Sequence, residues 1–337
     1  MAKLERQFAS INKEANVYYL NTTDATNDFD SVSPWKDIQE TEPDAQGNIW
    51  IKIPKFYTKY VLDENGVIKE RYISIFNGGT GWHLNPLFLN ENGKEIDEVY
   101  ISKYLLTDSN NMYKSLSGAT PIQNKTPTEA RTKIAYYNNT LSDGYNYCLF
   151  DIWALIALQD LCIVEFANSS AQSIVKGYTE RGTQLGSTGM MDNIGNKTPI
   201  QTTGSRAIDA QQDESGNYSM KYRGIENLWG YGRTFIDGLK VKDNKFHYST
   251  NILEYNLEGS YTAVSNSPLG TGYVWKLSYD ENSKLVLPVE LSNASNNSYA
   301  DFYSVGSDGD CYFHEGLYGF LAGNVNNKVY RMMKKPE

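Results

Sequence analysis

Few side chains in this sequence are suited to covalent or metal chemistry. The candidates are three cysteines and three histidines: Cys148, Cys162, Cys311, His83, His247 and His314. His314 follows Cys311 by three residues, and a nearby base can convert a thiol into the reactive thiolate. The alternative is that the run from Cys311 to His314 belongs to a binding loop or strand. We favour this alternative and expect that the protein is not an enzyme.

The sequence shows no clear metal or cofactor site. No two histidines have the spacing of zinc ligands. Asp308 and Asp310 carry oxygens that calcium could use, but the twelve-residue pattern of a calcium loop is missing, so a polar turn is favoured. Two glycine-rich runs, 78–81 and 182–189, lack the residues of a phosphate-binding loop. We therefore expect no metal and no cofactor.

Composition excludes several classes of protein. The 337 residues are 40% hydrophobic, which is enough for a sizeable core in one large domain or two. A formal net charge of −9 argues against a protein that binds nucleic acid through its phosphates. No apolar run approaches the length of a membrane span, and the first residues lack the apolar core of a secretion signal. We expect no nucleic-acid partner and no membrane insertion.

The order of strand and helix patterns predicts an α+β fold. Residues 1–80 look β-rich, with a hairpin turn at 63–66 where Asn-Gly accepts positive φ. The glycines of 77–81 suggest a boundary, so we predict an N-terminal segment, 1–80, for attachment or oligomerisation and a second domain, 81–337. Short strands are expected at 98–105, 239–242, 245–248, 273–277 and 328–333.

Two helices are predicted in the second domain. The first begins at Thr126, where Thr126 caps, Pro127 takes the first helical position and Glu129 completes a capping box; it ends near Tyr137. The second spans about 151–166, and apolar residues surround most of its circumference. A helix that apolar is expected to be buried on several sides.

The stretch 222–238, YRGIENLWGYGRTFIDG, is the most distinctive part of the chain. It places Glu226, Asn227, Trp229 and Asp237 among glycines and apolar residues. Its periodicity is neither helical nor strand-like, which is typical of a buried loop whose side chains hydrogen-bond its own backbone. We therefore predict that Glu226 and Trp229 are buried and structural.

This stretch resembles the GLEDLWGNVWEWVDG run of the C-type lectin-like fold. That fold is shared by formylglycine-generating enzymes, variable proteins of diversity-generating retroelements and tail proteins of many phages. The matching residues are Gly224, Ile225, Glu226, Asn227, Leu228, Trp229, Gly230, Phe235, Ile236, Asp237 and Gly238. The match fails at 231–234. Weaker similarities in the same order, including 30–35, 82–88 and 299–303, cover most of the chain.

The resemblance implies a domain in which two helices flank a small antiparallel sheet, the terminal strands pair and a long loop region presents the ligand surface. It implies that Glu226 and Asp237 hold the loop that carries Trp229 and are not acid/base partners. Formylglycine-generating enzymes work through a pair of late cysteines, whereas only Cys311 is late here.

The late part of the chain is the predicted ligand surface. Tyrosine combines apolar area with a hydroxyl at low entropic cost, and the chain has 26 tyrosines. The expected ligand-binding residues are Tyr299, Tyr303, Tyr312, Phe313 and His314. The alternative is that these aromatic residues form the core of the last strands, and Tyr299 and Phe302 are the first candidates for burial.

These expectations combine into a virion protein of a phage or prophage, made in the bacterial host cytoplasm. It would be a tail fibre or tip protein that recognises a bacterial surface ligand, glycan or protein, without chemistry. The resemblance carries the expectation of a homotrimer that contacts other tail proteins. Two alternatives remain: a non-receptor virion component such as a head fibre or baseplate decoration, and an enzyme related to formylglycine-generating enzymes.

Overall fold

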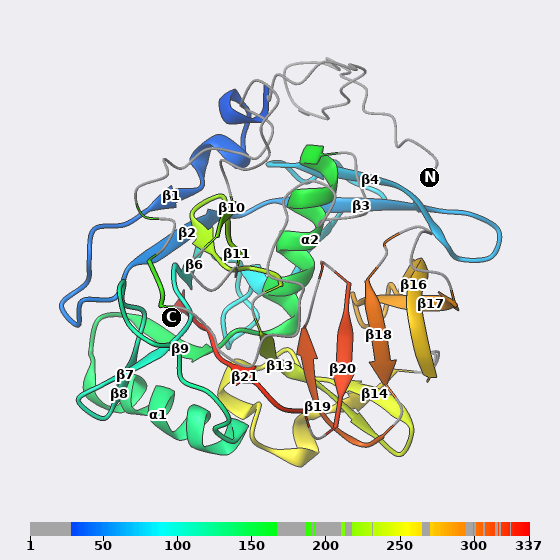
Figure 1. Cartoon of the computed structure of the whole chain (residues 1–337). Coiled ribbons are helices and arrows are strands. Elements are labelled where there is room, and N and C mark those ends of the chain that lie inside the picture. The colour runs from blue at the N-terminus through cyan, green and yellow to red at the C-terminus, as the bar shows by residue number, and fades with distance from the viewer. Residues whose placement is uncertain are drawn as a thin grey trace.

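The computed structural model of the chain (Figure 1) confirms the α+β class. It describes residues 28–166, 187–189, 192, 210–212, 218–230, 232–264, 270–293, 299, 301–305, 307–313, 316, 318–323 and 325–337. Within them lie two α-helices, α1 (Pro127–Thr140) and α2 (Ile152–Phe166), with many short strands. Short 3₁₀ turns are η1 (Asp28–Ser31), η2 (Trp35–Asp37), η3 (Pro86–Phe88), η5 (Ile252–Glu254) and η6 (Glu258–Ser260).

A five-stranded antiparallel sheet brings together distant parts of the chain. Its order is β1 (Gln39–Glu40), β2 (Trp50–Pro54), β6 (Glu98–Ser102), β22 (Met332–Pro336) and β9 (Tyr145–Leu149). The late strand β22 lies between β6 and β9, where Met333 pairs with both Ile101 and Cys148. The predicted closing strand at 328–333 is thus two strands, because β21 (Lys328–Val329) pairs with a different sheet.

The second large sheet has nine strands and holds most of the chain after residue 232. Along its main path lie β15 (Thr262–Ala263), β14 (Lys245–Tyr248), β13 (Arg233–Lys242), β19 (Gly309–Phe313), β20 (Phe320–Ala322), β18 (Phe302–Val305), β16 (Gly270–Tyr279) and β17 (Val286–Ser292), and β21 pairs with β13. The register of β13 against β19 shifts between Ile236 and Lys240. At that irregularity the amide of Asp237 donates to the carbonyl of Phe150, at 2.9 Å, and so links the two large sheets.

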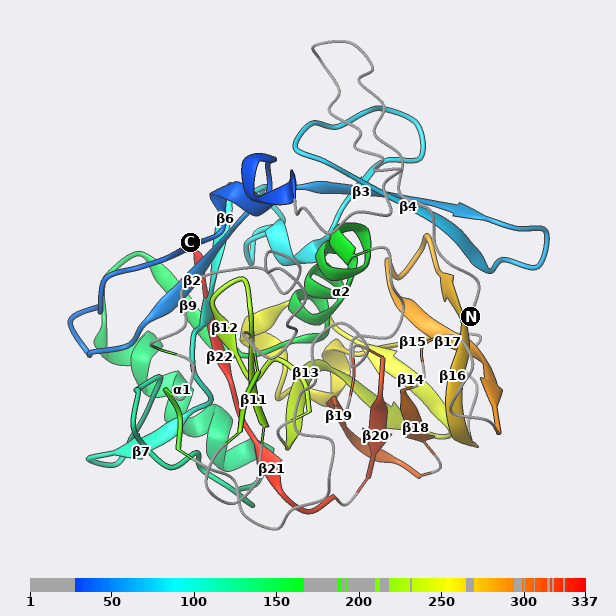
Figure 2. The same cartoon turned by 45° about the horizontal axis from the view of Figure 1, so that its top comes forward.

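Three smaller sheets contain the other described strands. One contains β4 (Ile68–Ser74), β3 (Tyr57–Leu62) and β5 (His83–Leu84), another β10 (Ala210–Gln212), β11 (Tyr218–Tyr222) and β12 (Ile225–Glu226), and the last β7 (Thr107–Ser109) and β8 (Met112–Lys114). The predicted hairpin at 63–66 is confirmed: Asp63 accepts from the amides of Asn65 and Val67, and β3 and β4 form a long arm (Figure 2).

Both predicted helices are confirmed, and α1 has its capping box. The Glu129 amide donates to Thr126 Oγ1 at 3.2 Å, and the Thr126 amide donates to Glu129 Oε2 at 2.8 Å. The helix continues three residues beyond the predicted end. The side chain of Asn138 exchanges two hydrogen bonds with the backbone of Tyr147 on β9.

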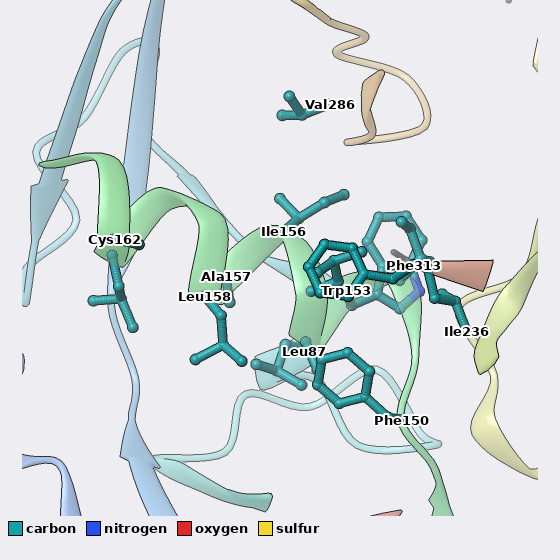
Figure 3. Close-up of a cluster of buried hydrophobic side chains, with 14 of the residues drawn as sticks. Leu87, Phe150, Trp153, Ile156, Ala157, Leu158, Cys162, Ile236, Val286 and Phe313 are labelled. Atoms are coloured by element: carbon teal, nitrogen blue, oxygen red, sulfur yellow. The ribbon is translucent and has the colours of Figure 1, made fainter. Parts of the chain in front are cut away.

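Helix α2 is the centre of the main hydrophobic core. Asp151 caps it by accepting from the Ala154 amide at 2.8 Å, and every side chain of the helix except Val164 is buried. Figure 3 shows Trp153 beside Phe313, with Leu87 on another side of the helix. Burying one large apolar side chain contributes about 1.5–3 kcal/mol, so a helix enclosed on all sides is a large part of the total stabilisation.

The two predicted regions, 1–80 and 81–337, share one sheet and one core. Strand β2 pairs with β6 across the predicted boundary. The indole of Trp35 donates to the carbonyl of Leu161 on α2 at 3.2 Å, and Phe29 and Trp35 belong to the same hydrophobic cluster as α2. The glycines at 77–81 therefore form a loop within the fold and do not divide its core.

Residues 222–230 and 234–238 are buried, as predicted for this stretch, although β12 and part of β13 lie within it. Asn227 adopts φ of 53°, and its side-chain oxygen accepts from the amide of Met220 at 3.1 Å. Glu226 accepts from the amide of Gly189 at 2.9 Å. Trp229 is 1% exposed and contacts the ring of Tyr222, with centroids 6.2 Å apart.

Replacing Trp229 by alanine tests the structural role of this stretch. We expect Trp229→Ala to lower the free energy of unfolding by about 3–5 kcal/mol, because a buried indole leaves a cavity. Tyr136→Ala is the matched control, since Tyr136 is 50% exposed on α1 and should change stability by less than about 0.5 kcal/mol. Urea unfolding followed by circular dichroism measures both, and equal stability of the two variants would show that the indole is not structural.

Candidate functional site

The predicted ligand-binding residues do not form a surface. Tyr303, Tyr312 and Phe313 are 0%, 1% and 1% exposed, and Tyr299 is half-buried. His314 lies outside the described residues. The expected order of burial was also wrong, because Phe302 and Tyr299 are more accessible than Tyr312 and Phe313.

The cause of this burial is that both faces of β19 are covered. Phe313 and Cys311 belong to the cluster around α2, whereas Tyr312 belongs to a second cluster with Ile134 and Tyr137 of α1. Tyr312 also contacts the ring of Phe235, with centroids 5.8 Å apart. Side chains with so little exposure offer no area to a ligand, so these residues correspond to the alternative in which they form the core of the last strands.

The three cysteines are buried free thiols. Burial raises the pKa of all three, and the charge of Asp310 adds to the effect at Cys311. A raised pKa keeps a thiol protonated and poorly nucleophilic at neutral pH. Asp308 accepts from the amides of Asp243 and Asn244, at 3.1 and 3.2 Å, whereas Asp310 lies in strand β19, so the predicted polar turn does not extend to Asp310.

Across the described ranges, no three histidine, cysteine, aspartate or glutamate side chains are grouped so that they could hold a metal ion. Neither described helix has the length and apolar character of a membrane span.

A pocket of about 270 Å³ lies between α1, β9, β13 and the turn at η5. Its floor contains an ion pair between Arg131 of α1 and Asp237 of β13. Arg131 Nε donates to Asp237 Oδ2 at 2.9 Å, and Nη2 donates to Oδ1 at 2.7 Å. The guanidinium also lies over the ring of Phe235, 5.3 Å from its centroid. This two-point contact fixes the orientation of Arg131.

Both members of this ion pair are stabilised by their surroundings. Asp237 is buried, and its Oδ1 also accepts from the Gly238 amide at 3.0 Å. Burial alone would lower the pKa of Arg131, but the hydrogen bonds and charge of Asp237 outweigh it and the pKa is raised. The guanidinium therefore stays charged at neutral pH.

One wall of the pocket is equally rigid. The hydroxyl of Tyr255 donates to Asp151 Oδ2 at 2.7 Å, and burial raises the pKa of Asp151. Gly238, with φ of 71°, allows this arrangement, because a Cβ there would lie 3.0 Å from the Tyr255 ring. The rim is open: Thr132 and Ala135 of α1 are exposed, and Leu253 is 48% exposed.

Sequence reasoning identified Asp237 but not its partner. Arg131 lies in the predicted helix 126–137 with no pattern that distinguishes it from a solvated charge. A usable signal was the predicted burial of the stretch around Asp237, since a buried carboxylate requires a cation or hydrogen-bond donors.

A second feature that the sequence did not reveal is a cluster of three half-buried aromatic rings: Tyr60, His83 and Tyr279. Their centroids are 4.5–5.2 Å apart. The Tyr60 hydroxyl donates to Asp160, which also pairs with Arg71 at 2.7 Å. Burial, and to a lesser degree Lys284, lowers the pKa of His83 to about 4.

Comparisons of the chain with protein-family models and with curated proteins found no match. The relation to the C-type lectin-like fold therefore stays a prediction from the residues of 222–238 and the weaker blocks.

The burial of the three cysteines predicts that none of them is a reactive thiol, and this can be tested. We expect all three cysteines of the native protein to react with a chromogenic disulfide reagent at pH 8 at least about tenfold more slowly than in denaturant, because each unit of raised pKa lowers the thiolate fraction tenfold. One native thiol that reacts as fast as a small-molecule thiol would restore a nucleophile to consideration.

His83 leads to a pH test. Its folded pKa of about 4 lies below its unfolded value near 6.5, so between these values the unfolded chain binds more protons. Stability should then fall as the pH falls from about 6.5 to 4. In His83→Phe, which keeps a ring in the cluster, this loss should shrink by on the order of 2 kcal/mol. Identical pH profiles for the two proteins in urea unfolding would contradict the neutral, buried imidazole.

Proposed function

We propose that this chain is a non-catalytic virion protein of a phage or prophage, with a C-type lectin-like fold, that binds a ligand on the bacterial surface. The observation that carries the proposal is the pocket at Arg131 and Asp237. It is open to solvent, it has a rigid floor with hydrogen-bond donors, and its thiol, Cys148, has a raised pKa. Such a site can hold a molecule but has no evident group to transform one.

The fold identity draws its support from the sequence and from how the matching residues are used. Glu226 and Asn227 bond to neighbouring backbone, and Asp237 joins β13 to α1. Glu226 has the structural role that the resemblance implies, whereas Asp237 bonds to Arg131 of α1. The presence of two helices supports the proposal, whereas the late strand β22 pairs with β6 and β9 and not with the first strands of its sheet.

The proposed setting is the tail or another surface appendage of the virion, with other tail proteins as partners. A trimer would place three copies of the pocket on one tip. Several weak sites that bind together give far stronger adhesion than one, provided that the geometry lets them engage at once. The buried thiols argue against the enzyme alternative, because formylglycine-generating enzymes need a late pair of reactive cysteines.

The proposal is tested by adsorption of the purified, labelled protein to bacterial strains that include the host of the phage or prophage. We expect saturable binding to the host. Ala135→Trp, which places a large ring at the open pocket rim, should lose at least about tenfold in affinity, or about 1.4 kcal/mol. Thr140→Trp is the control, because Thr140 is exposed on α1 and does not line the pocket.

Two outcomes would count against the proposal. Absence of adsorption to the host would favour the role of a head fibre or baseplate decoration. Adsorption that Ala135→Trp leaves unchanged would place the ligand surface elsewhere, with the cluster of Tyr60, His83 and Tyr279 as the next candidate.

A further inference from the structure

The unused hydrogen-bonding groups of the pocket indicate what kind of molecule it takes. A guanidinium has five N–H donors, and two of those of Arg131 are used by Asp237. The other three have no hydrogen-bond partner among the described residues. Thr132 adds a hydroxyl that donates to the Thr128 carbonyl at 2.9 Å and keeps its acceptor capacity. The pocket thus offers several donors and hydroxyls at fixed positions.

The charge of the pocket distinguishes acidic from neutral ligands. Its charged lining residues are Arg131 and Asp237, which carry opposite charges and are already paired. A carboxylate at Arg131 would meet a guanidinium that is already neutralised and would lie near the like charge of Asp237. Hydroxyl and carbonyl oxygens accept from the same N–H groups without this repulsion. The balance of charge therefore favours an uncharged ligand that is rich in oxygen.

The apolar lining residues and the volume of the pocket limit the kind of ligand further. Apolar side chains such as Ile134, Leu149, Ile252 and Leu253 contribute to the walls, so one face of the ligand meets carbon. The volume of about 270 Å³ lies just below the range of about 300–1,000 Å³ for drug-sized ligands. A molecule the size of one sugar ring, with polar edges and an apolar face, matches both properties.

We propose that this pocket binds one uncharged sugar residue, so that the bacterial ligand is a neutral glycan. The inference rests on the proposed function for the source of the ligand. Arg131 supplies donors to the ring hydroxyls or an N-acetyl oxygen, Thr132 accepts a hydrogen bond at the rim, and the apolar wall contacts the face of the ring.

Saturation-transfer NMR with free monosaccharides tests the proposal without cells. The probes are two matched pairs, glucose with glucuronate and galactose with galacturonate, together with N-acetylglucosamine and rhamnose. We expect at least one neutral sugar to bind, and its acidic counterpart, where there is one, to bind at least about threefold more weakly.

The variants locate the binding. Ala135→Trp should abolish the transfer signal, and Thr132→Val should weaken binding by about two- to tenfold through loss of one hydrogen bond. Thr140→Trp should bind as the parent does. Thermal unfolding of each variant checks the fold, and these positions are exposed, so a substituted side chain there needs no space in the core.

The outcomes separate this proposal from the previous one. Preferential binding of the acidic sugars, or no sugar binding by the folded parent protein, would overturn the neutral-sugar proposal even if the protein adsorbs to cells. Sugar binding that Ala135→Trp leaves intact would overturn the assignment to this pocket. Sugar binding in the pocket without adsorption to the host would support this inference and contradict the receptor-binding role.

Discussion

The ion pair between Asp237 and Arg131 is the interaction that fixes β13 of the nine-stranded sheet against helix α1. Asp237 lies at the irregularity of β13, where its amide leaves the nine-stranded sheet and donates to Phe150. Its carboxylate is buried and pairs with α1 through two hydrogen bonds. An uncompensated buried charge costs about 3–5 kcal/mol, so α1, the end of β9 and β13 must be placed together. The same contact forms part of the lining of the pocket.

Strand β22 is anchored by a different kind of interaction. The guanidinium of Arg331, just before this strand, is buried and donates to the carbonyls of Ser102, Lys103 and Glu226. Burial lowers the pKa of Arg331 to about 9, so it is still charged at neutral pH. The next lysine, Lys334, has its ammonium 4.2–5.6 Å from the centroids of four rings: Trp50, Tyr100, Tyr145 and Tyr147. Carbonyl dipoles and aromatic faces thus replace water around both cations.

Local features of the fold could be predicted from sequence, whereas the burial of late residues could not. The capping box of α1 and the turn at 63–66 depend on residues within four positions of each other, so pattern and chemistry suffice. The burial of the late aromatic residues is harder to predict, because alternation along β19 tells which residues share a face but not whether both faces are covered. The same limit applies to the pocket: Arg131 and Asp237 meet only through the packing of α1 on β13.

The central place of β22 has a consequence for how the protein is made. A ribosome releases β6 and β9 well before β22, and synthesis from Leu149 to Met332 takes roughly ten to forty seconds at ~5–20 residues per second. Throughout that interval the facing edges of β6 and β9 lack their partner, and an open edge can pair with another nascent chain. Neighbouring ribosomes on one message would hold such chains close together. At high expression, a chaperone that covers the edges of β6 and β9 until β22 is synthesised should therefore reduce aggregation of the nascent chains.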